Sequence, residues 1–161
     1  MHSGTVTVVN DWALFGHPLF LQRLEDLIEE VEGLAEDDPD GFHHHAHYKL
    51  LEKVEEAILV RAPTNPAAPE YFQGKTLGKE NGHWRRIKNG LPNRYRLFFQ
   101  FRSDAPKSII YAWLNDEATL RKDGSKTDVY AVFLAKVKRG EIPSSFADLE
   151  RAAGPIPGHL G

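Results

Sequence analysis

Residues 84–113 read WRRIKNGLPNRYRLFFQFRSDAPKSIIYAW, and this stretch decides the expected fold. Its aromatic and β-branched residues favour strands, and the residues between them are typical of turns. The strands are predicted at Trp84–Lys88, Tyr95–Phe101 and Ser108–Trp113. Three consecutive strands joined by short turns form an antiparallel meander.

Two amphipathic helices are predicted upstream of the meander. The first begins at Pro18 and ends in the acidic, turn-rich cluster Glu36–Gly41, because apolar residues recur at helical spacing along one face. These residues are Phe20, Leu24, Leu27, Ile28 and Val31. The second helix is expected from Phe42 to about Arg61 on the same spacing. Helices joined by so short a turn are expected to pack antiparallel as a hairpin.

Shorter segments complete the expected order of elements. Thr5–Val9 predicts a strand, and Ala62–Glu70 predicts a linker or surface loop because it holds three prolines. A last helix is predicted to start near Ser125 or Thr127 and to end at Gly140. The segregation of helices from strands along the chain indicates an α+β domain.

Length and composition limit the class of protein. A chain of 161 residues with 41% hydrophobic residues and a mean hydropathy of −0.45 is expected to fold as one soluble domain over residues 1–161, with a flexible tail from about 155 to 161. No apolar run is long enough to span a membrane, and no secretory signal is recognised. The lack of cysteine excludes disulfides, thiolate nucleophiles and cysteine-ligated metals, which fits a reducing cytoplasm.

The net charge of −3 hides an uneven distribution of charge along the chain. Residues 1–70 carry 4 Lys and Arg against 14 Asp and Glu, whereas residues 71–161 carry 16 against 9. The balances are therefore −10 and +7, and eight basic residues with one acid fall within 71–102. This asymmetry suggests that the second half meets a polyanion, although solvated surface charge gives the same pattern.

The predicted strands place several cations on one face of the sheet. Side chains alternate along a strand, so Arg86 and Lys88 share a face, and Arg96 is expected to join them together with Phe98 and Gln100. Arginine offers a planar fork to phosphate, and lysine offers a compact charge. We therefore expect an open basic face suited to a sugar-phosphate backbone, with a plain polar solvent face as the alternative.

Residues 115–130 add a further set of candidates. Three cations follow the last predicted strand, where the chain leaves the sheet edge: Arg121, Lys122 and Lys126. The polar residues 115–117 either cap a turn or serve the site. The spacing of Tyr130 in the last helix favours packing in the core over a phenol turned toward a cleft.

Histidines are the remaining candidates. The cluster of His43, His44, His45 and His47 contains pairs at helical spacing, but two ligands make a weak metal site, and no glutamate lies between them as in zinc hydrolases. The cluster is interpreted as a solvated helix start, and no metal is expected. His83 has a reference pKa suited to acid–base chemistry, yet its place in a loop favours plain surface. Gly-rich phosphate-binding loops, dinucleotide fingerprints and serine-hydrolase motifs are absent from the sequence.

Several motifs resemble those of the YhaV family of toxins, within the RelE/ParE superfamily of bacterial type II toxin–antitoxin systems. They are Asn10-x-Trp12-Ala-Leu with His17-Pro18, Gly74-Lys75-x-Leu77-Gly78, Trp84-x-Arg86-x-Lys88, Arg94-Tyr-Arg-Leu-Phe98-Phe99, Trp113-x-Asn115-Asp-Glu-x-Thr-Leu-Arg121 and Lys126-Thr-Asp-x-Tyr130. They cover most of the chain. The long motif from Trp113 is specific to the YhaV group, whereas Tyr95-Arg96-Leu97-Phe98 is shared by the superfamily.

The resemblance implies a RelE-like α+β fold, with an N-terminal two-helix hairpin packed on a small antiparallel sheet and a C-terminal helix. It implies an endoribonuclease that needs no metal or other cofactor and cleaves messenger RNA, free or on the ribosome. The implied catalytic residues are Arg86, Lys88, Arg96, Arg121 and Tyr130. The cations expected to bind RNA are Lys75, Lys79, Arg85, Arg94, Lys122 and Lys126. A PrlF-type antitoxin is the implied partner, in the cytoplasm and away from membranes.

The chemistry implied for such a site is attack of an RNA 2′-OH on the adjacent phosphorus. By resemblance, Arg86 and Arg96 stabilise charge, Lys88 or Tyr130 acts as base, and Arg121 acts as acid or clamp. Two rival functions stay open at this point. One is poisoning of DNA gyrase, as by ParE-like proteins, and the other is RNA binding without cleavage.

Overall fold

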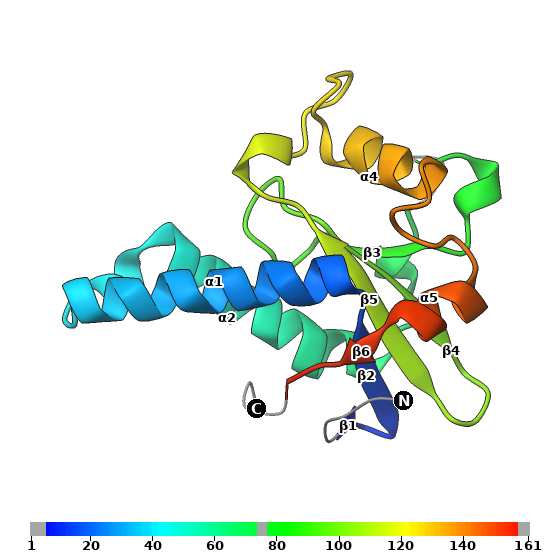
Figure 1. The fold of residues 1–161 in the computed structure, drawn as a ribbon, viewed down its shortest axis with the longest axis horizontal. Helices are drawn as coiled ribbons and strands as arrows, with labels where there is room; N and C mark the ends of the chain where they lie inside the picture. The colour runs from blue at the N-terminus through cyan, green and yellow to red at the C-terminus, as the bar shows by residue number, and fades with distance from the viewer. Residues whose placement is uncertain (1–5, 74–76, 158–161) are drawn as a thin grey trace.

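The computed structural model describes residues 6–73 and 77–157, which form an α+β protein around a mixed sheet (Figure 1). The strand order is β1-β2-β5-β4-β3, and β6 pairs with β2. The strands are β1 Thr7–Val9, β2 Trp12–Gly16, β3 Arg85–Ile87, β4 Leu97–Arg102, β5 Ser108–Leu114 and β6 Gly154–Pro155. β3, β4 and β5 pair antiparallel in sequence order, so the predicted meander is confirmed.

The strand β2 was not expected, and it changes the character of the sheet. It pairs parallel with β5, which places Phe15 beside Ile110. Two strands therefore precede the packed helix pair, and the sheet is mixed, so the implied arrangement of an N-terminal helix hairpin on a small antiparallel sheet is not confirmed.

The first predicted helix is confirmed as α1, Pro18–Asp37. His17 caps it, because its Nδ1 accepts the Leu19 N–H at 3.1 Å, and Pro18 occupies a first-turn position that needs no backbone donor. Phe20, Leu24, Leu27 and Val31 form its buried stripe. α1 is packed along α2, Ala46–Glu56, and Figure 1 shows the pair extending together away from the sheet.

The second helix begins four residues later than predicted. Phe42–His44 forms a 3₁₀ turn (η1), and His45 is extended and caps α2 by accepting the His47 N–H. At its other end the helix continues through a π-helical turn, Ala57–Arg61 (η2), into α3, Ala62–Thr64. The loop predicted from Ala62 is therefore wrong at its start, where Ala62 and Pro63 are buried. Farther along the chain lie the 3₁₀ turns η3 Pro69–Tyr71, η4 Lys79–Asn81 and η5 Glu117–Thr119.

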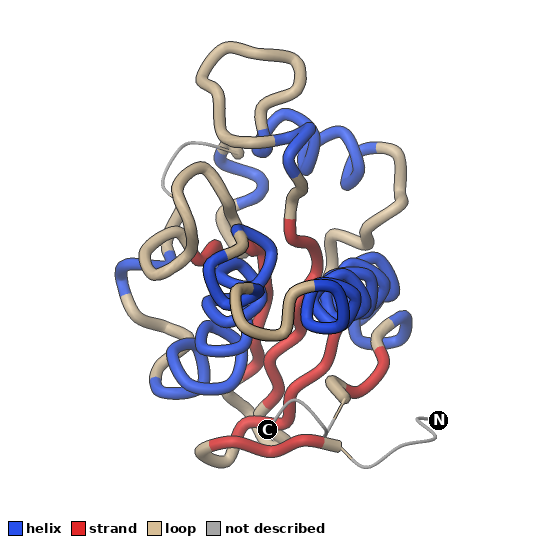
Figure 2. The backbone as a smooth tube through the Cα atoms, turned by 90° about the vertical axis from the view of Figure 1, so that its left-hand side faces the viewer, coloured by secondary structure: helices blue, strands red, loops and turns tan. Residues whose placement is uncertain are grey.

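The sheet is covered on both faces, by two separate hydrophobic cores. The first core joins α1 and α2 to the inward side chains of β4 and β5, such as Phe99 and Tyr111. Figure 2 views these two long helices nearly end-on, with the strands beside them. The second core lies on the opposite face under α4, Val129–Lys138, and α5, Phe146–Ala152.

The second core corrects the expectation of an open basic face. Phe98, which shares its face with the expected cations, is fully buried and stacks on Phe133 of α4 with ring centroids 4.0 Å apart. Gln100 is buried as well, and its Nε2 donates to the Ser144 carbonyl at 2.8 Å. Arg86 and Arg96 are therefore gathered at the end of this face near the start of β4.

The C-terminal region also differs from expectation. Asp128 caps α4, which starts at Val129 and ends before Gly140, where φ is 79°. The tail expected from about residue 155 is wrong for Pro155 and Ile156, because β6 pairs with β2 and Ile156 is fully buried. Residues 158–161 lie outside the described part. Within residues 6–73 and 77–157, no helix is long and apolar enough to cross a membrane.

Candidate active site

Two arginines meet on the hydroxyl of one tyrosine. Arg86 Nε donates to Tyr130 Oη at 2.8 Å, and Arg96 Nε donates to the same oxygen at 3.2 Å. Arg86 lies in β3 opposite Phe98, and Arg96 immediately precedes β4, so strand alternation directs both toward α4. The structure thus brings together three of the five candidate catalytic residues. We call Arg86, Arg96 and Tyr130 the tyrosine–arginine cluster.

Tyr130 satisfies both interpretations of its position. The residue is 6% exposed, and its ring packs edge-on against Phe98 with centroids 5.6 Å apart, as the core interpretation requires. Its hydroxyl faces the arginines at the rim of that core. Because a phenol oxygen has two acceptor positions and one proton, the two guanidinium donors leave the Tyr130 O–H available to a substrate.

Arg121 lies against the tyrosine–arginine cluster from the loop before α4. Its guanidinium carbon lies 4.9 Å from the centre of the Tyr130 ring, and its Nη1 lies 2.9 Å from Asp128 Oδ1. Asp128 also accepts the Lys122 N–H at 2.5 Å and the Tyr130 N–H at 3.1 Å. One carboxylate therefore fixes both the Arg121 side chain and the first turn of the helix that carries Tyr130.

The charges of this pair bear on the role of Arg121. Its hydrogen bond to Asp128 raises the pKa of the Arg121 guanidinium. Burial alone would raise the pKa of Asp128, but the hydrogen bonds from Arg121 and from the Lys122 N–H outweigh it and lower that pKa. Arg121 consequently keeps its proton, which suits a clamp on phosphate better than a general acid.

Asn115 joins the strands and the loop behind the cluster. It is fully buried, and its Oδ1 accepts the Arg96 N–H at 2.9 Å. Its Nδ2 donates to the carbonyls of Arg94 at 3.2 Å and Thr119 at 2.8 Å. The Arg94 carbonyl also accepts the Arg121 N–H at 2.9 Å. Asn115 therefore fixes the backbone conformation of the segments that carry Arg96 and Arg121. The neighbouring Asp116 caps η5, as the turn interpretation predicted.

We expect Asn115→Ala to lower both stability and activity. Each buried backbone group left without a partner costs about 1–3 kcal/mol of unfolding free energy. The matched control is Leu27→Ala in α1, which costs about 2–5 kcal/mol but does not contact the cluster. Denaturant unfolding and cleavage rates, measured where both variants are folded, should show a much lower rate for Asn115→Ala only. Equal rates would show that Asn115 is merely structural.

Two hollows adjoin the Arg96–Tyr130 hydrogen bond. One, of about 710 Å³, is lined by Tyr130, Arg121, Lys126 and Asp128 among others. The other, of about 320 Å³, is lined by Lys88, Arg94 and Arg96. Lys88 lies one residue beyond the end of β3 and is exposed, so it reaches this hollow from the turn and not from the strand as predicted. The cations along both hollows offer a path for several consecutive phosphates.

The remaining predicted cations are placed less centrally. Lys79 is exposed in η4, and Lys122 is exposed in the loop before α4. Arg85 is turned to the face of the sheet opposite Arg86 and stacks on Phe72. Lys75 lies outside the described residues.

The histidines lie apart from the tyrosine–arginine cluster. His47 bridges two carboxylates, with its Nδ1 3.2 Å from Glu30 and its Nε2 2.8 Å from Glu117. His83 Nε2 lies 2.8 Å from the Ser144 carbonyl. Among the described residues, no group of three or more histidines and carboxylates could hold a metal ion.

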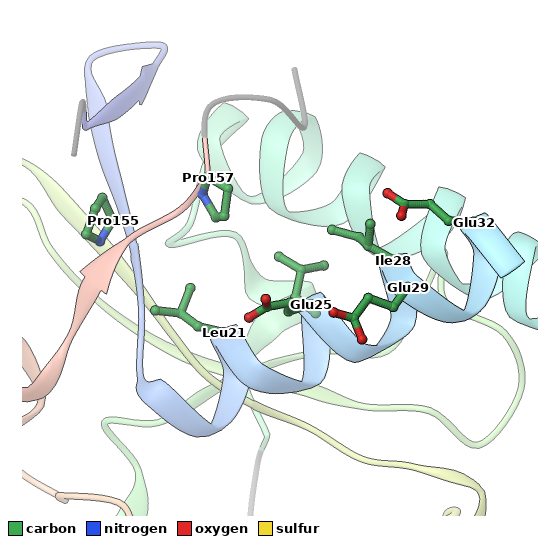
Figure 3. A pocket seen from close by; sticks show the side chains of 8 residues that line it. Leu21, Glu25, Ile28, Glu29, Glu32, Pro155 and Pro157 are labelled. Atoms are coloured by element: carbon green, nitrogen blue, oxygen red, sulfur yellow. The ribbon is translucent and has the colours of Figure 1, made fainter. Parts of the chain in front are cut away.

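A third hollow, of about 480 Å³, lies between α1 and the segment that follows β6 (Figure 3). Apolar and acidic side chains line it together, including Leu21, Ile28, Glu25, Glu29, Glu32, Pro155 and Pro157. Carboxylates repel phosphates, so this hollow does not continue the cationic path.

Sequence reasoning missed the supporting roles of Asn115 and Asp128. Both residues lie within the motifs of the YhaV resemblance, so the motifs marked these positions but did not show what the two side chains do. The reason is the pairing of distant backbone groups, which only the folded chain displays.

Comparison with known proteins identifies the class of the chain. The YhaV toxin family, described as toxins with endonuclease activity of toxin–antitoxin systems, matches residues 14–154. The chain is 44% identical over 144 residues to "Ribonuclease toxin YhaV" of Escherichia coli strain K12, across 89% of this chain and 92% of that protein. It is also 44% identical over 142 residues to "Toxin YhaV" of Escherichia coli O6:H1, across 88% and 91%. No solved structure matches the chain.

Proposed function

The chain belongs to the YhaV family of endonuclease toxins from toxin–antitoxin systems, and we propose that it cleaves RNA at the tyrosine–arginine cluster without a metal. It is thus an endoribonuclease toxin, and the family assignment removes the grounds for gyrase poisoning or RNA binding alone. The observation that carries the proposed site is the convergence of Arg86 and Arg96 on the Tyr130 hydroxyl, beside Arg121.

The proposed reaction is a transfer within the RNA. The 2′-oxygen forms a bond to the adjacent phosphorus as the bond from phosphorus to the 5′-oxygen breaks. The 2′-OH proton passes to a base and the leaving 5′-oxygen receives a proton, which leaves a 2′,3′-cyclic phosphate and a 5′-OH. Negative charge grows on the phosphate oxygens during this step, and Arg86 and Arg96 are placed to stabilise it.

Tyr130 is favoured over Lys88 as the base that accepts the 2′-OH proton. Its hydroxyl lies at the centre of the cluster, whereas Lys88 lines the neighbouring hollow. Arg86 and Arg96 stabilise the charge that grows on the phosphate oxygens, and Arg121 acts as the clamp.

The direct test of this function is incubation of the purified protein with RNA in the presence of EDTA. Cleavage supports a metal-independent ribonuclease. Retention of RNA without cleavage supports a non-catalytic binder. If the protein neither cleaves nor retains RNA, RNA is not its target. The same assay with and without ribosomes shows whether messenger RNA is cut in the free or the ribosome-bound form.

Membership of a toxin–antitoxin system implies a cognate antitoxin. The partner is proposed to be of the PrlF type, and the fold to be a RelE-like single domain that acts in the cytoplasm. The balance of +7 in residues 71–161 makes the cationic path a natural target for an anionic segment of that antitoxin. Such a segment would cover the same cations that bind phosphate.

Antitoxin and RNA are therefore expected to exclude each other. The measurement is titration of antitoxin into a complex of the toxin with 2′-O-methyl RNA, which lacks the attacking hydroxyl and stays intact. RNA should be released in proportion to the antitoxin bound. A ternary complex with undiminished RNA affinity would contradict occlusion and leave distortion or assembly as the means of inhibition.

A further inference from the structure

An exposed aromatic ring and a stacked arginine lie at the free edge of the sheet. Phe72 is 51% exposed, and the Arg85 guanidinium carbon lies 4.5 Å from the centre of its ring. With Gln73 and Gly82, these two residues line a hollow of about 230 Å³. We call it the Phe72 hollow.

The Phe72 hollow and the tyrosine–arginine cluster are connected by adjacent residues of β3. Arg85 and Arg86 are consecutive in β3, the edge strand of the sheet, so their side chains leave it on opposite faces. Phe72 forms an isolated bridge with Arg85, and Arg86 Nη1 donates to the Glu70 carbonyl at 3.0 Å, two residues before Phe72. An RNA strand bound at Arg86 can therefore reach this hollow by passing over the edge of β3.

Arg85 carries an unused donor in this position. Its Nη1 donates to the Gly82 carbonyl at 2.8 Å, but its Nε is buried and has no partner in the described structure. A buried N–H without a partner is costly, and an acceptor atom of a ligand relieves that cost if the Arg85 side chain shifts to open this nitrogen to the hollow. Burial also lowers the pKa of Arg85, in keeping with a guanidinium held against an aromatic ring and away from water.

These observations describe a site for a planar, acceptor-bearing ring. The volume is below the range of about 300–1,000 Å³ typical of pockets for whole small molecules, so it suits one ring system. Bases stack on exposed aromatic rings and on arginine in proteins that bind single-stranded nucleic acid. Val8 and Val60 are as exposed as Phe72, yet neither has a ring on which a base can stack, so exposure alone does not mark the site.

We propose that the Phe72 hollow binds one nucleobase of the RNA substrate, next to the phosphate held by Arg86. This inference rests on the proposed function and extends it from the phosphates to a base. Phe72 supplies the stacking surface, and the Arg85 Nε donates to an acceptor on the base edge once the side chain shifts to expose it. Occupation by the antitoxin instead is one of the outcomes of the test.

The test is a double-mutant cycle between protein and RNA. Binding of a 2′-O-methyl RNA oligonucleotide is measured for the wild type and for Phe72→Ala, with each nucleotide in turn replaced by an abasic residue. Phe72→Ala should weaken binding of the intact oligonucleotide roughly tenfold. At one position the abasic replacement should weaken binding to the wild type but not to Phe72→Ala, because the contact is already lost.

Two further variants keep the test sharp. Val60→Ala is the matched control, since it removes a side chain that is 57% exposed in η2 and does not line the hollow, and it should leave binding unchanged. Gly82→Leu should fill the hollow and mimic Phe72→Ala, because a Cβ at Gly82 meets only the Lys79 carbonyl, at 3.5 Å.

Phe72→Ala with unchanged RNA affinity, or abasic effects that are the same in both proteins, would overturn the inference while leaving cleavage intact. Loss of antitoxin affinity with unchanged RNA affinity would also overturn it and would assign the hollow to the antitoxin. Phe72-dependent binding without any cleavage would instead contradict the proposed function and leave the nucleobase site standing.

Discussion

Arg96→Ala is expected to reduce the rate of RNA cleavage by about 100-fold or more while the protein stays folded. The Arg96 side chain donates to Tyr130 Oη at the centre of the cluster, and loss of one donor that stabilises transition-state charge costs about that much in other enzymes. Its backbone N–H, which bonds to Asn115, is kept in the variant. Cleavage rate and circular dichroism together provide the measurement.

Arg102→Ala is the matched control for this prediction. Arg102 ends the same strand, and its guanidinium pairs with Glu150 at 2.9 Å, away from Tyr130. Its cleavage rate should stay within a few-fold of the wild type. A folded Arg96→Ala variant with normal activity would remove Arg96 from the site, and an unfolded variant would show that the residue is structural.

The second large effect is expected in the salt dependence of RNA binding. If five cations each contact one phosphate, the logarithm of affinity should fall with the logarithm of salt with a slope of about −3.5, or roughly 100-fold between 50 and 200 mM. The five are Arg86, Lys88, Arg96, Arg121 and Lys126. Substituting any one of them by alanine should flatten the slope by about 0.7.

Lys107→Ala serves as the control for salt dependence. Lys107 is exposed and immediately precedes β5, whose opposite end pairs with the start of β4, so its loss should leave the slope unchanged. An affinity that does not depend on salt would contradict the cationic path as a whole.

The meander and the arginines could be predicted because their signals are local. Period-two patterns and short turns fix β3, β4 and β5 in order, and strand alternation then places Arg86 on the face that Arg96 also reaches. The α1 stripe was equally readable, since its apolar residues recur every three or four positions.

The pairings that failed prediction are distant in the sequence. Trp12–Gly16 is apolar on both sides, so it shows no alternation, and its partner β5 lies more than 90 residues away. The Gly154–Pro155 pair is typical of a loose tail, yet the Ile156 N–H donates to the Leu14 carbonyl at 3.2 Å and closes the edge of β2. The amino-acid composition of a segment cannot predict pairing with a strand so distant in the sequence.

The prediction of an open basic face was wrong for a different reason. The expected face already contained Phe98, an aromatic residue beside the cations, and its neighbours Trp113 and Phe133 came from segments whose relative placement was unknown. α4 covers these rings, so the cations are concentrated at the end of the face around Tyr130. The covering helix thereby supplies the tyrosine that an open sheet could not have positioned.

If the tyrosine–arginine cluster drives attack by the 2′-OH without a metal, the chemical groups at the product ends must show it. RNA cleaved in EDTA is analysed for its termini. We expect a 2′,3′-cyclic phosphate and a 5′-OH, and no cleavage at a position where the 2′-OH is replaced by hydrogen. Products with a 3′-OH and a 5′-phosphate, or cleavage abolished by EDTA, would contradict it.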